Sequence, residues 1–368
     1  MAFNLPPWYS QWKKDNPVSY RGPVILLVVG FTVFLSFIAL MVYWSYLDPR
    51  SIQTGPRGTG MTVEKFAYER NAPIPGVADY YTEEAYAPEG DETLASEAYE
   101  NVQVLGDLTE DNFNRLMLAM TEWVSPEQGC VYCHNEENLA SDDVYTKIVA
   151  RRMIQMTQNI NENWDGHVGD VGVNCYSCHQ GQNVPSNIWF KIAPGLEAAE
   201  GWGARQNLAT TQTVSTSLPH DALEELLIEE AMIKVHDLEP RVPGIPGQGD
   251  LASIQDTERT YSLMNYFANS LGVNCTFCHN SRAFYDGAEV TPQWATAFIG
   301  IDMVREMNSE YLVPLQETYP PHRLGPKFGD APKAACKTCH KGVQKPLGGL
   351  GMIADWPELV GSGAPTYE

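Results

Sequence analysis

The cysteines constrain this sequence most, because all eight occur in four copies of the pattern Cys-x-x-Cys-His. This pattern is typical of c-type haem attachment, in which two thiols form thioethers to the porphyrin and the adjacent histidine binds the iron from one face. Zinc sites or redox dithiols also use paired cysteines, but neither requires a histidine directly after every second cysteine. We therefore expect four covalently attached c-type haems and no cysteine left for a disulfide, a lipid anchor or a nucleophile. The four motifs, whose haems are numbered 1 to 4, are Cys130, Cys133, His134; Cys175, Cys178, His179; Cys275, Cys278, His279; and Cys336, Cys339, His340.

The charge of the chain limits its partners. The 368 residues include 46 acidic and 24 basic side chains, which give a formal net charge of -22. Binding to nucleic acid requires clustered lysine and arginine, so the composition excludes it as a main function. A basic protein is a better candidate partner.

An apolar segment near the N-terminus predicts a membrane span. No residue from Gly22 to Leu47 is charged, and a helix of this length would extend about 39 Å, enough to cross a hydrocarbon core of about 30 Å. A signal peptide is the alternative, but its apolar region is about 7 to 15 residues long and ends at a small-residue cleavage site. We expect an uncleaved anchor helix over residues 22–47. Since Lys13, Lys14 and Arg21 precede it, residues 1–21 should form a cytoplasmic tail and the rest should be periplasmic.

The remaining chain predicts a mainly α fold with much irregular loop. Residues 48–100 are rich in proline, glycine and acidic residues and predict an extended periplasmic linker. A tetrahaem domain over 101–358 and a C-terminal tail over 359–368 should follow. Apolar residues recur at helical spacing before each motif, which predicts helices over 111–124, 144–164, 256–271 and 296–318. The best candidate for extended chain is 210–218.

Internal repetition predicts a multihaem cytochrome c fold built by duplication. CVYCHN of motif 1 matches CTFCHN of motif 3, and CYSCHQG of motif 2 matches CKTCHKG of motif 4. We interpret the repeating unit as helix, turn and CxxCH, duplicated as two haems.

The residues alone leave more than one candidate for the second axial ligand of the irons. Methionines lie on the predicted helix before each motif, and each has an alternative or could simply fill the core. Glycines surround His167, so the backbone could approach a haem closely there. We interpret His220 and His322 as surface residues and His236 as a possible core residue. The methionine candidates are Met117 or Met120 for haem 1, Met153 or Met156 for haem 2, Met264 for haem 3, and Met303 or Met307 for haem 4.

From about Tyr99 to Leu359 the sequence resembles the tetrahaem cytochrome c subunit of purple bacterial photosynthetic reaction centres. The strings that carry the resemblance include connectors without haem chemistry: YENVQVLGDLT, WVSPEQGCVYCHN, GVNCYSCHQGQNVP, YSLMNYFANSLGVNCTFCHN, GIDMVREMN and CKTCHKGVQKPL. The resemblance implies that Met117, Met153 and Met264 bind haems 1, 2 and 3. It also implies that His167, rather than Met303 or Met307, caps haem 4, and that the haems lie in the order 1, 2, 4, 3.

The same resemblance implies an electron carrier and no enzyme. It would pass electrons from a soluble periplasmic donor, such as a small basic cytochrome c or a high-potential iron-sulfur protein, to the photo-oxidised bacteriochlorophyll special pair. Its partners would be the membrane subunits of the reaction centre, in the bacterial inner, photosynthetic membrane. The best-known family members are anchored by a lipidated cysteine, but no cysteine precedes Cys130 here, so we expect the single-pass helix to be the anchor. The alternatives are a membrane-anchored tetrahaem quinol dehydrogenase and a multihaem reductase with one open iron.

Overall fold

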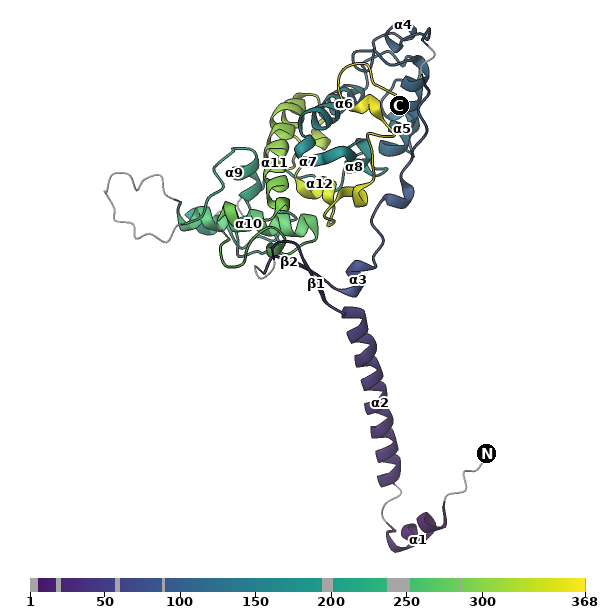
Figure 1. The fold of residues 1–368 in the computed structure, drawn as a ribbon, viewed down its shortest axis with the longest axis vertical. Coiled ribbons are helices and arrows are strands. Elements are labelled where there is room, and N and C mark those ends of the chain that lie inside the picture. Colours follow the sequence, from purple (N-terminus) through teal and green to yellow (C-terminus); the bar gives the residue numbers. More distant parts are fainter. Residues whose placement is uncertain are drawn as a thin grey trace, which may run out of the picture. The chain divides into compact units, whose positions relative to one another are not determined.

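The computed structural model describes residues 6–17, 21–56, 60–87, 90–193, 201–236, 252–284 and 286–367. These residues form a mainly helical chain with long irregular connections (Figure 1). Two short strands, β1 (Arg50–Gln53) and β2 (Thr62–Lys65), form a two-stranded sheet. The chain divides into two compact units, of which the first comprises residues 1–52 and 64–73 and the second comprises 53–63 and 74–368.

The first unit contains the predicted anchor. Its helices are α1 (Pro7–Asp15), α2 (Arg21–Leu47) and α3 (Ala67–Arg70). Residues 22–47 of α2 have a mean hydropathy of 2.8, and none of the most apolar stretch is buried. A helix that is apolar on every side, and whose most apolar stretch is unburied, has the length and surface of a membrane span. An apolar N-terminal helix is therefore confirmed at the predicted position.

Aromatic and ionic contacts hold the segment that follows α2. The rings of Tyr46 and Tyr68 stack with their centroids 5.0 Å apart, and Arg70 lies 2.8 Å from the carboxylate of Asp48. Tyrosine is common where a membrane helix leaves the hydrocarbon.

The second unit contains all four motifs. The predicted helices are confirmed, with one difference in the last. The last helix begins at Pro292, a residue suited to the first helical turn because proline has no N–H to lose. After Glu306 it continues as a π-helical turn (Met307–Leu312) and a 3-10 turn (Val313–Glu317). The prediction of extended chain at 210–218 is wrong, because these residues form bends and turns. The helices of this unit are α4 (Ala95–Ala98), α5 (Glu110–Val124), α6 (Tyr145–Asn163), α7 (Asp165–Val168), α8 (Cys175–His179), α9 (Ala222–Leu227), α10 (Ile254–Leu271), α11 (Pro292–Glu306) and α12 (Cys336–His340).

Local signals explain where the long helices begin. Thr109 caps α5, since its side chain accepts a hydrogen bond from the backbone N–H of Asn112. Ser253 and Asp256 form a reciprocal capping box at the start of α10. Each cap satisfies backbone donors that have no partner within the helix.

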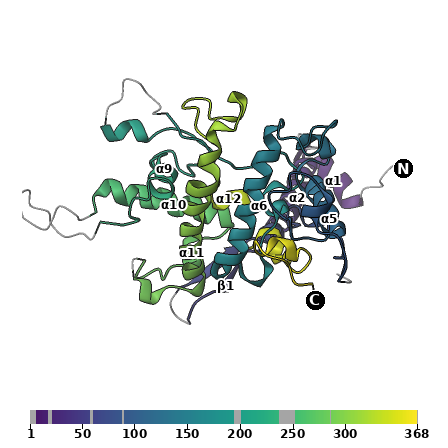
Figure 2. The same ribbon diagram turned by 90° about the horizontal axis from the view of Figure 1, so that it is seen from above.

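Packing in the second unit follows the predicted repeat. Helix α5 contacts α8, α10 contacts α12, and α8 and α12 contact each other. In Figure 2 the elements of the first half, α5 and α6, lie to one side of α12, and α9, α10 and α11 lie to the other. The apolar core has two clusters, one around Trp123 and Trp356 and one around Leu263 and Met303, and α6 contributes Ile154 to the first and Ile160 to the second.

Part of the predicted linker packs on the helices that it precedes. The ring of Tyr80 stacks on that of Trp123 at 6.3 Å, and the indole N–H of Trp123 donates to the carbonyl of Tyr81. Further along, Asn112 exchanges two hydrogen bonds with the backbone of Tyr86. At the other end, Leu359 of the predicted tail is wholly buried. Both segments thus belong structurally to the second unit.

Candidate haem-binding site

A large cavity of about 1760 Å³ lies within the second unit. Its volume exceeds the roughly 300–1,000 Å³ of a site for one drug-sized ligand, so it can hold several large groups. Side chains from α5, α6, α8, α11 and α12 line it, together with the loops between them. Of the predicted haem and iron ligands, those that line it are Met117, Cys130, Cys133, His134, Met153, His167, Cys175, Cys178, His179, Cys336, Cys339 and His340.

The backbone of the motifs follows the predicted pairing. Motifs 1 and 3 begin as 3-10 turns (Gly129–Tyr132 and Cys275–Phe277), whereas motifs 2 and 4 form the short helices α8 and α12. The residues after α8 and α12, Gln180 and Lys341, both adopt the left-handed conformation, with φ of 48° and 50°. Non-glycine residues rarely adopt this conformation, so its recurrence supports a common origin for motifs 2 and 4.

Three of the motif histidines are oriented by a backbone carbonyl. A ring Nδ1 that donates to a carbonyl fixes the tautomer and leaves Nε2 with the free lone pair that binds a metal. Burial lowers the pKa of His179 and of His340 to about 4, which favours the neutral, coordinating form. The pairs are His134 with Leu139 at 2.9 Å, His179 with Gln182 at 2.8 Å and His340 with Val343 at 3.1 Å.

His167 faces the histidine of motif 4. The centres of the His167 and His340 rings lie 6.1 Å apart. Two imidazoles on opposite sides of one metal ion place their coordinating nitrogens about 4 Å apart, and hence their ring centres about 6 Å apart. The Nδ1 of His167 lies 2.8 Å from the carbonyl of Thr296, so its Nε2 is free, and burial lowers its pKa.

Helix α11 leaves room for this histidine because residue 300 is a glycine. A Cβ on Gly300 would lie 2.4 Å from Cε1 of His167, which is too close for any side chain. Glycine here allows the imidazole to pack directly against the helix backbone.

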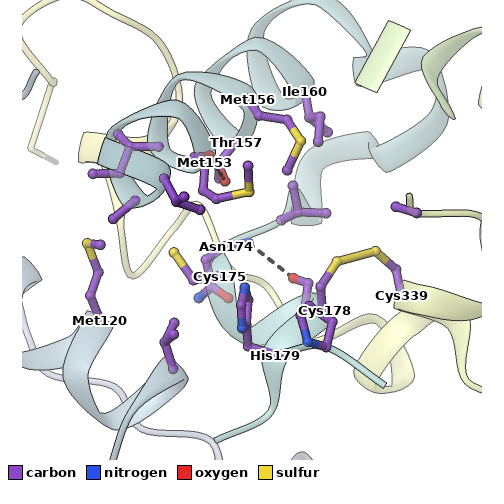
Figure 3. A pocket seen from close by; sticks show the side chains of 18 of the residues that line it. Met120, Met153, Met156, Thr157, Ile160, Asn174, Cys175, Cys178, His179 and Cys339 are labelled. Carbon is purple, nitrogen blue, oxygen red and sulfur yellow. Dashed lines mark hydrogen bonds between the residues drawn. A yellow bond between two sulfur atoms is a disulfide. The ribbon is translucent and has the colours of Figure 1, made fainter. Parts of the chain in front are cut away.

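The methionine candidates of haems 1 and 2 all line the cavity. In Figure 3, Met153 and Met156 extend from α6 toward the space above α8, which carries Cys175 and His179. Met117 and Met120 of α5 line the same cavity. Since both members of each pair reach it, the choice of Met117 and Met153 stays a prediction.

The predicted ligands of haem 3 lie apart from this cavity. Met264 of α10 is half-buried against the core cluster that contains Leu263, whereas Cys275 is exposed. The buried Nδ1 of His279 has no hydrogen-bond partner among the described residues. Motif 3 and Met264 therefore offer their donors outside this cavity.

The structure joins Cys178 and Cys339 in a disulfide, with their Cα atoms 4.6 Å apart. This differs from the expectation that no cysteine is left for a disulfide. The reason is the contact between α8 and α12, which brings the second thiols of motifs 2 and 4 within bonding reach of each other (Figure 3).

The histidines outside the motifs differ in their outcome. His322 is exposed, as predicted, at the edge of the cavity, and His236 is half-buried. The interpretation of His220 as a surface residue is wrong: only 4% of it is exposed, and neither ring nitrogen has a hydrogen-bond partner in the described part of the chain. It is buried because α9 begins two residues later and packs on α10.

Met303 and Met307 pack in the core, as the resemblance implies. Both are more than nine-tenths buried within one apolar cluster, and both also reach the cavity wall.

Sequence reasoning missed two cations at the cavity. Lys333 is only 2% exposed, donates to the carbonyl of Ala331 and pairs with Asp330, and burial lowers its pKa. Arg323 donates to the hydroxyls of Tyr132 and Tyr145. Neither residue belongs to a recognisable motif, so only the tertiary structure identifies them.

Comparison with known proteins places this geometry in a family. Residues 47–360 match the family described as photosynthetic reaction centre cytochrome C subunit. The photosynthetic reaction center cytochrome c subunit of Roseobacter denitrificans is 60% identical over 371 residues, which cover 99% of this chain and 100% of the relative. The proteins of the same name from Rubrivivax gelatinosus and Thermochromatium tepidum are each 40% identical, over 89% and 84% of this chain and 88% and 75% of their own lengths. Family membership makes covalent c-type haem the cofactor class of this protein. The chain belongs to the family of photosynthetic reaction centre cytochrome c subunits.

Proposed function

We propose that this protein carries four c-type haems and passes electrons from a soluble periplasmic donor to the photo-oxidised bacteriochlorophyll special pair of the reaction centre. A relative that bears the name of this subunit matches 99% of the chain. The observation that carries the proposal is the cavity, because three CxxCH motifs and their candidate distal ligands converge on it. A bound haem supplies a one-electron couple between ferric and ferrous iron.

The residues fit this group in number and in kind. Paired thiols would anchor each porphyrin, and His134, His179 and His340, each oriented through Nδ1, would bind the iron through Nε2. The wall is predominantly apolar, which suits a large aromatic plate and excludes water from it. Motif 3 offers the same donor set outside the cavity, so we assign the fourth haem to Cys275, Cys278, His279 and Met264.

We assign His167 as the distal ligand of haem 4. Its ring faces His340 at a distance suited to one intervening iron, and Thr296 fixes its tautomer. Methionine ligation raises a haem midpoint relative to a second histidine. With Met117, Met153 and Met264 on the other three, haem 4 should have the lowest midpoint.

The two sulfurs of Cys178 and Cys339 can each be bonded either to the other or to a porphyrin. We assign them to haems 2 and 4 in the mature protein, where each thiol adds across a vinyl group. Their proximity then brings the edges of these two porphyrins together, which supports the order 1, 2, 4, 3. It also supports a duplicated two-haem unit whose halves meet at α8 and α12.

The partners follow from the anchor and the charge. The apolar helix α2 would hold the protein in the photosynthetic membrane, with the haem domain, predicted over residues 101–358, on the periplasmic side beside the reaction-centre membrane subunits. A net charge of -22 favours long-range attraction of a basic donor. The match over residues 47–360 favours this role over a quinol dehydrogenase.

Flash-induced absorption changes in isolated membranes test the proposal. We expect haem oxidation within each flash, followed by re-reduction when donor is present. Absence of light-driven oxidation in membranes that contain assembled haems and reaction centres would contradict it. Mass spectrometry of proteolytic peptides should find haem on all four motifs, and a Cys178–Cys339 cross-linked peptide in place of two haem peptides would contradict the assignment of four.

A further inference from the structure

The loop after motif 1, residues 135–143, is closed around one buried ammonium group. Lys147 is 8% exposed, and its Nζ donates to the carbonyls of Leu139, Ala140 and Ser141 at 2.8, 2.7 and 2.9 Å. Lys147 lies in the first turn of α6, where the positive end of the helix dipole disfavours a cation. The three carbonyls compensate both for this position and for the burial.

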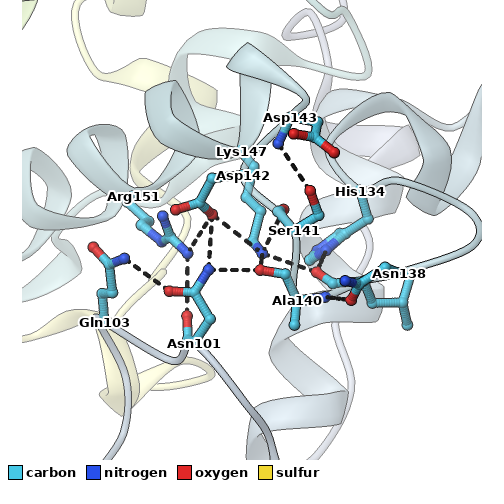
Figure 4. Close-up of polar contacts among 11 residues, drawn as sticks. Asn101, Gln103, His134, Asn138, Ala140, Ser141, Asp142, Asp143, Lys147 and Arg151 are labelled. Carbon is cyan, nitrogen blue, oxygen red and sulfur yellow. Dashed lines mark hydrogen bonds and ion pairs between the residues drawn. The ribbon is translucent and has the colours of Figure 1, made fainter.

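One of these carbonyls also orients an iron ligand. The oxygen of Leu139 accepts the Nδ1 hydrogen bond of His134 at 2.9 Å, so the histidine and the ammonium share a single acceptor (Figure 4). A carbonyl oxygen has two lone pairs and can accept both bonds. The ammonium polarises this oxygen and thereby weakens it as an acceptor for the imidazole.

Motifs 2 and 4 lack this arrangement. The carbonyls that orient His179 and His340 belong to Gln182 and Val343. Within the described ranges, neither carbonyl accepts a second side-chain hydrogen bond. Motif 1 therefore differs from its two neighbours in the cavity by one cation on the acceptor of its histidine.

Neighbouring side chains hold the ammonium in place. Asp142 lies 3.4 Å from Nζ of Lys147 and 2.9 Å from the guanidinium of Arg151, and Asn101 donates to the same carboxylate at 2.9 Å. Arg151 lies one helical turn after Lys147 on the same face of α6. Lys147 and Arg151 thus share a single carboxylate, that of Asp142, which fixes the position of the ammonium.

We propose that Lys147 is a positioning residue that raises the midpoint potential of haem 1 by withdrawing electron density from the carbonyl that orients His134. A weaker acceptor makes the imidazole a poorer donor, and a poorer donor stabilises ferric iron less. The inference rests on the proposed attachment of haem 1 to Cys130 and Cys133. It makes haem 1 a stronger oxidant of the external donor than its ligands alone would.

The test compares two substitutions that remove the same charge from the cluster. Lys147→Met removes the cation and frees the Leu139 oxygen, whereas Arg151→Met removes a cation that does not contact this oxygen. Redox titration of the full-length protein in membranes should show that Lys147→Met lowers one midpoint. At a fixed potential, the ratio of oxidised to reduced haem should change on the order of tenfold, which corresponds to about 59 mV for a one-electron couple. The other three should not move, and Arg151→Met should shift the same midpoint by much less.

Two further measurements keep the result interpretable. The midpoint that shifts in Lys147→Met should be the same one that shifts in Met117→His. In the reduced Lys147→Met protein, the Nδ1 proton resonance of His134 should move downfield, because its hydrogen bond to Leu139 strengthens. If Lys147→Met fails to retain haem 1, Lys147→Gln keeps an N–H donor without the charge and should lower the same midpoint.

The outcomes separate the two proposals. Equal midpoint shifts in Lys147→Met and Arg151→Met would mean that charge alone sets the potential, and would overturn the role of the shared carbonyl. No midpoint shift in Lys147→Met, with all four haems attached, would overturn it as well. A wild-type chain without haem on motif 1 would instead overturn the proposed function, whatever Lys147 does.

Discussion

A buried ion pair fastens the C-terminal segment to the helix that carries Met117. The guanidinium of Arg115 lies 2.6 Å from a carboxylate oxygen of Glu358, and no part of either side chain is exposed. Arg115 also donates to the carbonyl of Asp355 and stacks over the ring of Trp356 at 4.0 Å. The perturbation that we consider is Arg115→Met, which keeps most of the apolar volume and removes the cation.

The expected loss follows from what remains. The carboxylate of Glu358 would keep the hydroxyl of Tyr367 at 3.3 Å as a partner, while its second oxygen already has none among the described residues. Breaking a buried pair in this way costs about 3–5 kcal/mol of the free energy of unfolding. Domains of about 150–250 residues lose about 2–4 °C in Tm per kcal/mol, so we expect a drop of about 6–20 °C.

Thermal loss of the visible haem circular dichroism in the solubilised protein measures this drop. Arg282→Met is the matched control, because the pair of Arg282 with Glu289 is largely exposed and is worth about 0–1 kcal/mol. The double variant Arg115→Met/Glu358→Met removes the orphaned charge and should recover part of the stability. A double variant no more stable than Arg115→Met, or a single variant no worse than the control, would refute this reasoning.

The remaining predictions concern the haem 4 ligand, the motif 1 loop and the donor. His167→Met should raise one midpoint in a redox titration, and four unchanged midpoints would contradict the assignment of His167. Gly300→Ala should displace His167 and open the iron to carbon monoxide, detected by a shifted Soret band, whereas Gly287→Ala, where a Cβ meets no atom within 4 Å, should not. The hydrogen bond and charge of Arg151 lower the pKa of Asp142, so its stabilisation is complete above its unfolded pKa of about 3.9 and is lost as the pH falls toward the lower folded pKa. In acid unfolding, the stability difference between wild type and Asp142→Asn should therefore vanish at low pH, and a constant difference would exclude this linkage. Stopped-flow association with a basic cytochrome donor should slow steeply as salt rises, and a salt-independent rate would favour apolar docking.

Much of the fold was predictable because its signals are local. Apolar spacing is enough to identify α5, α6 and α10, and the length of the uncharged run identifies α2. The sequence pairs the motifs, because motifs 1 and 3 end in CHN whereas motifs 2 and 4 end in CHQG and CHKG. The backbone pairs them in the same way, since a left-handed residue follows only motifs 2 and 4.

The parts that escaped prediction depend on distant partners. His220 appeared exposed because its neighbours are proline and aspartate, but α9 and α10 enclose it. Lys147 belongs to no motif. No local pattern indicates that a loop six to eight residues earlier turns three carbonyls toward it. The disulfide needs two motifs separated by 161 residues, which no local pattern reports.

Residues near the start of the second unit, Thr54 and Thr62, dock on motif 3, which is synthesised much later. Thr62 accepts hydrogen bonds from the side chains of Asn274 and Thr276, at sequence separations of 212 and 214, and Thr54 donates to Phe277 within motif 3. This segment is made early but cannot dock until motif 3 has been synthesised, and closing so long a loop is slow. During synthesis this segment therefore stays undocked until the first three motifs have been made. Haem attachment has this interval of open chain in which to reach Cys175, which the finished fold buries.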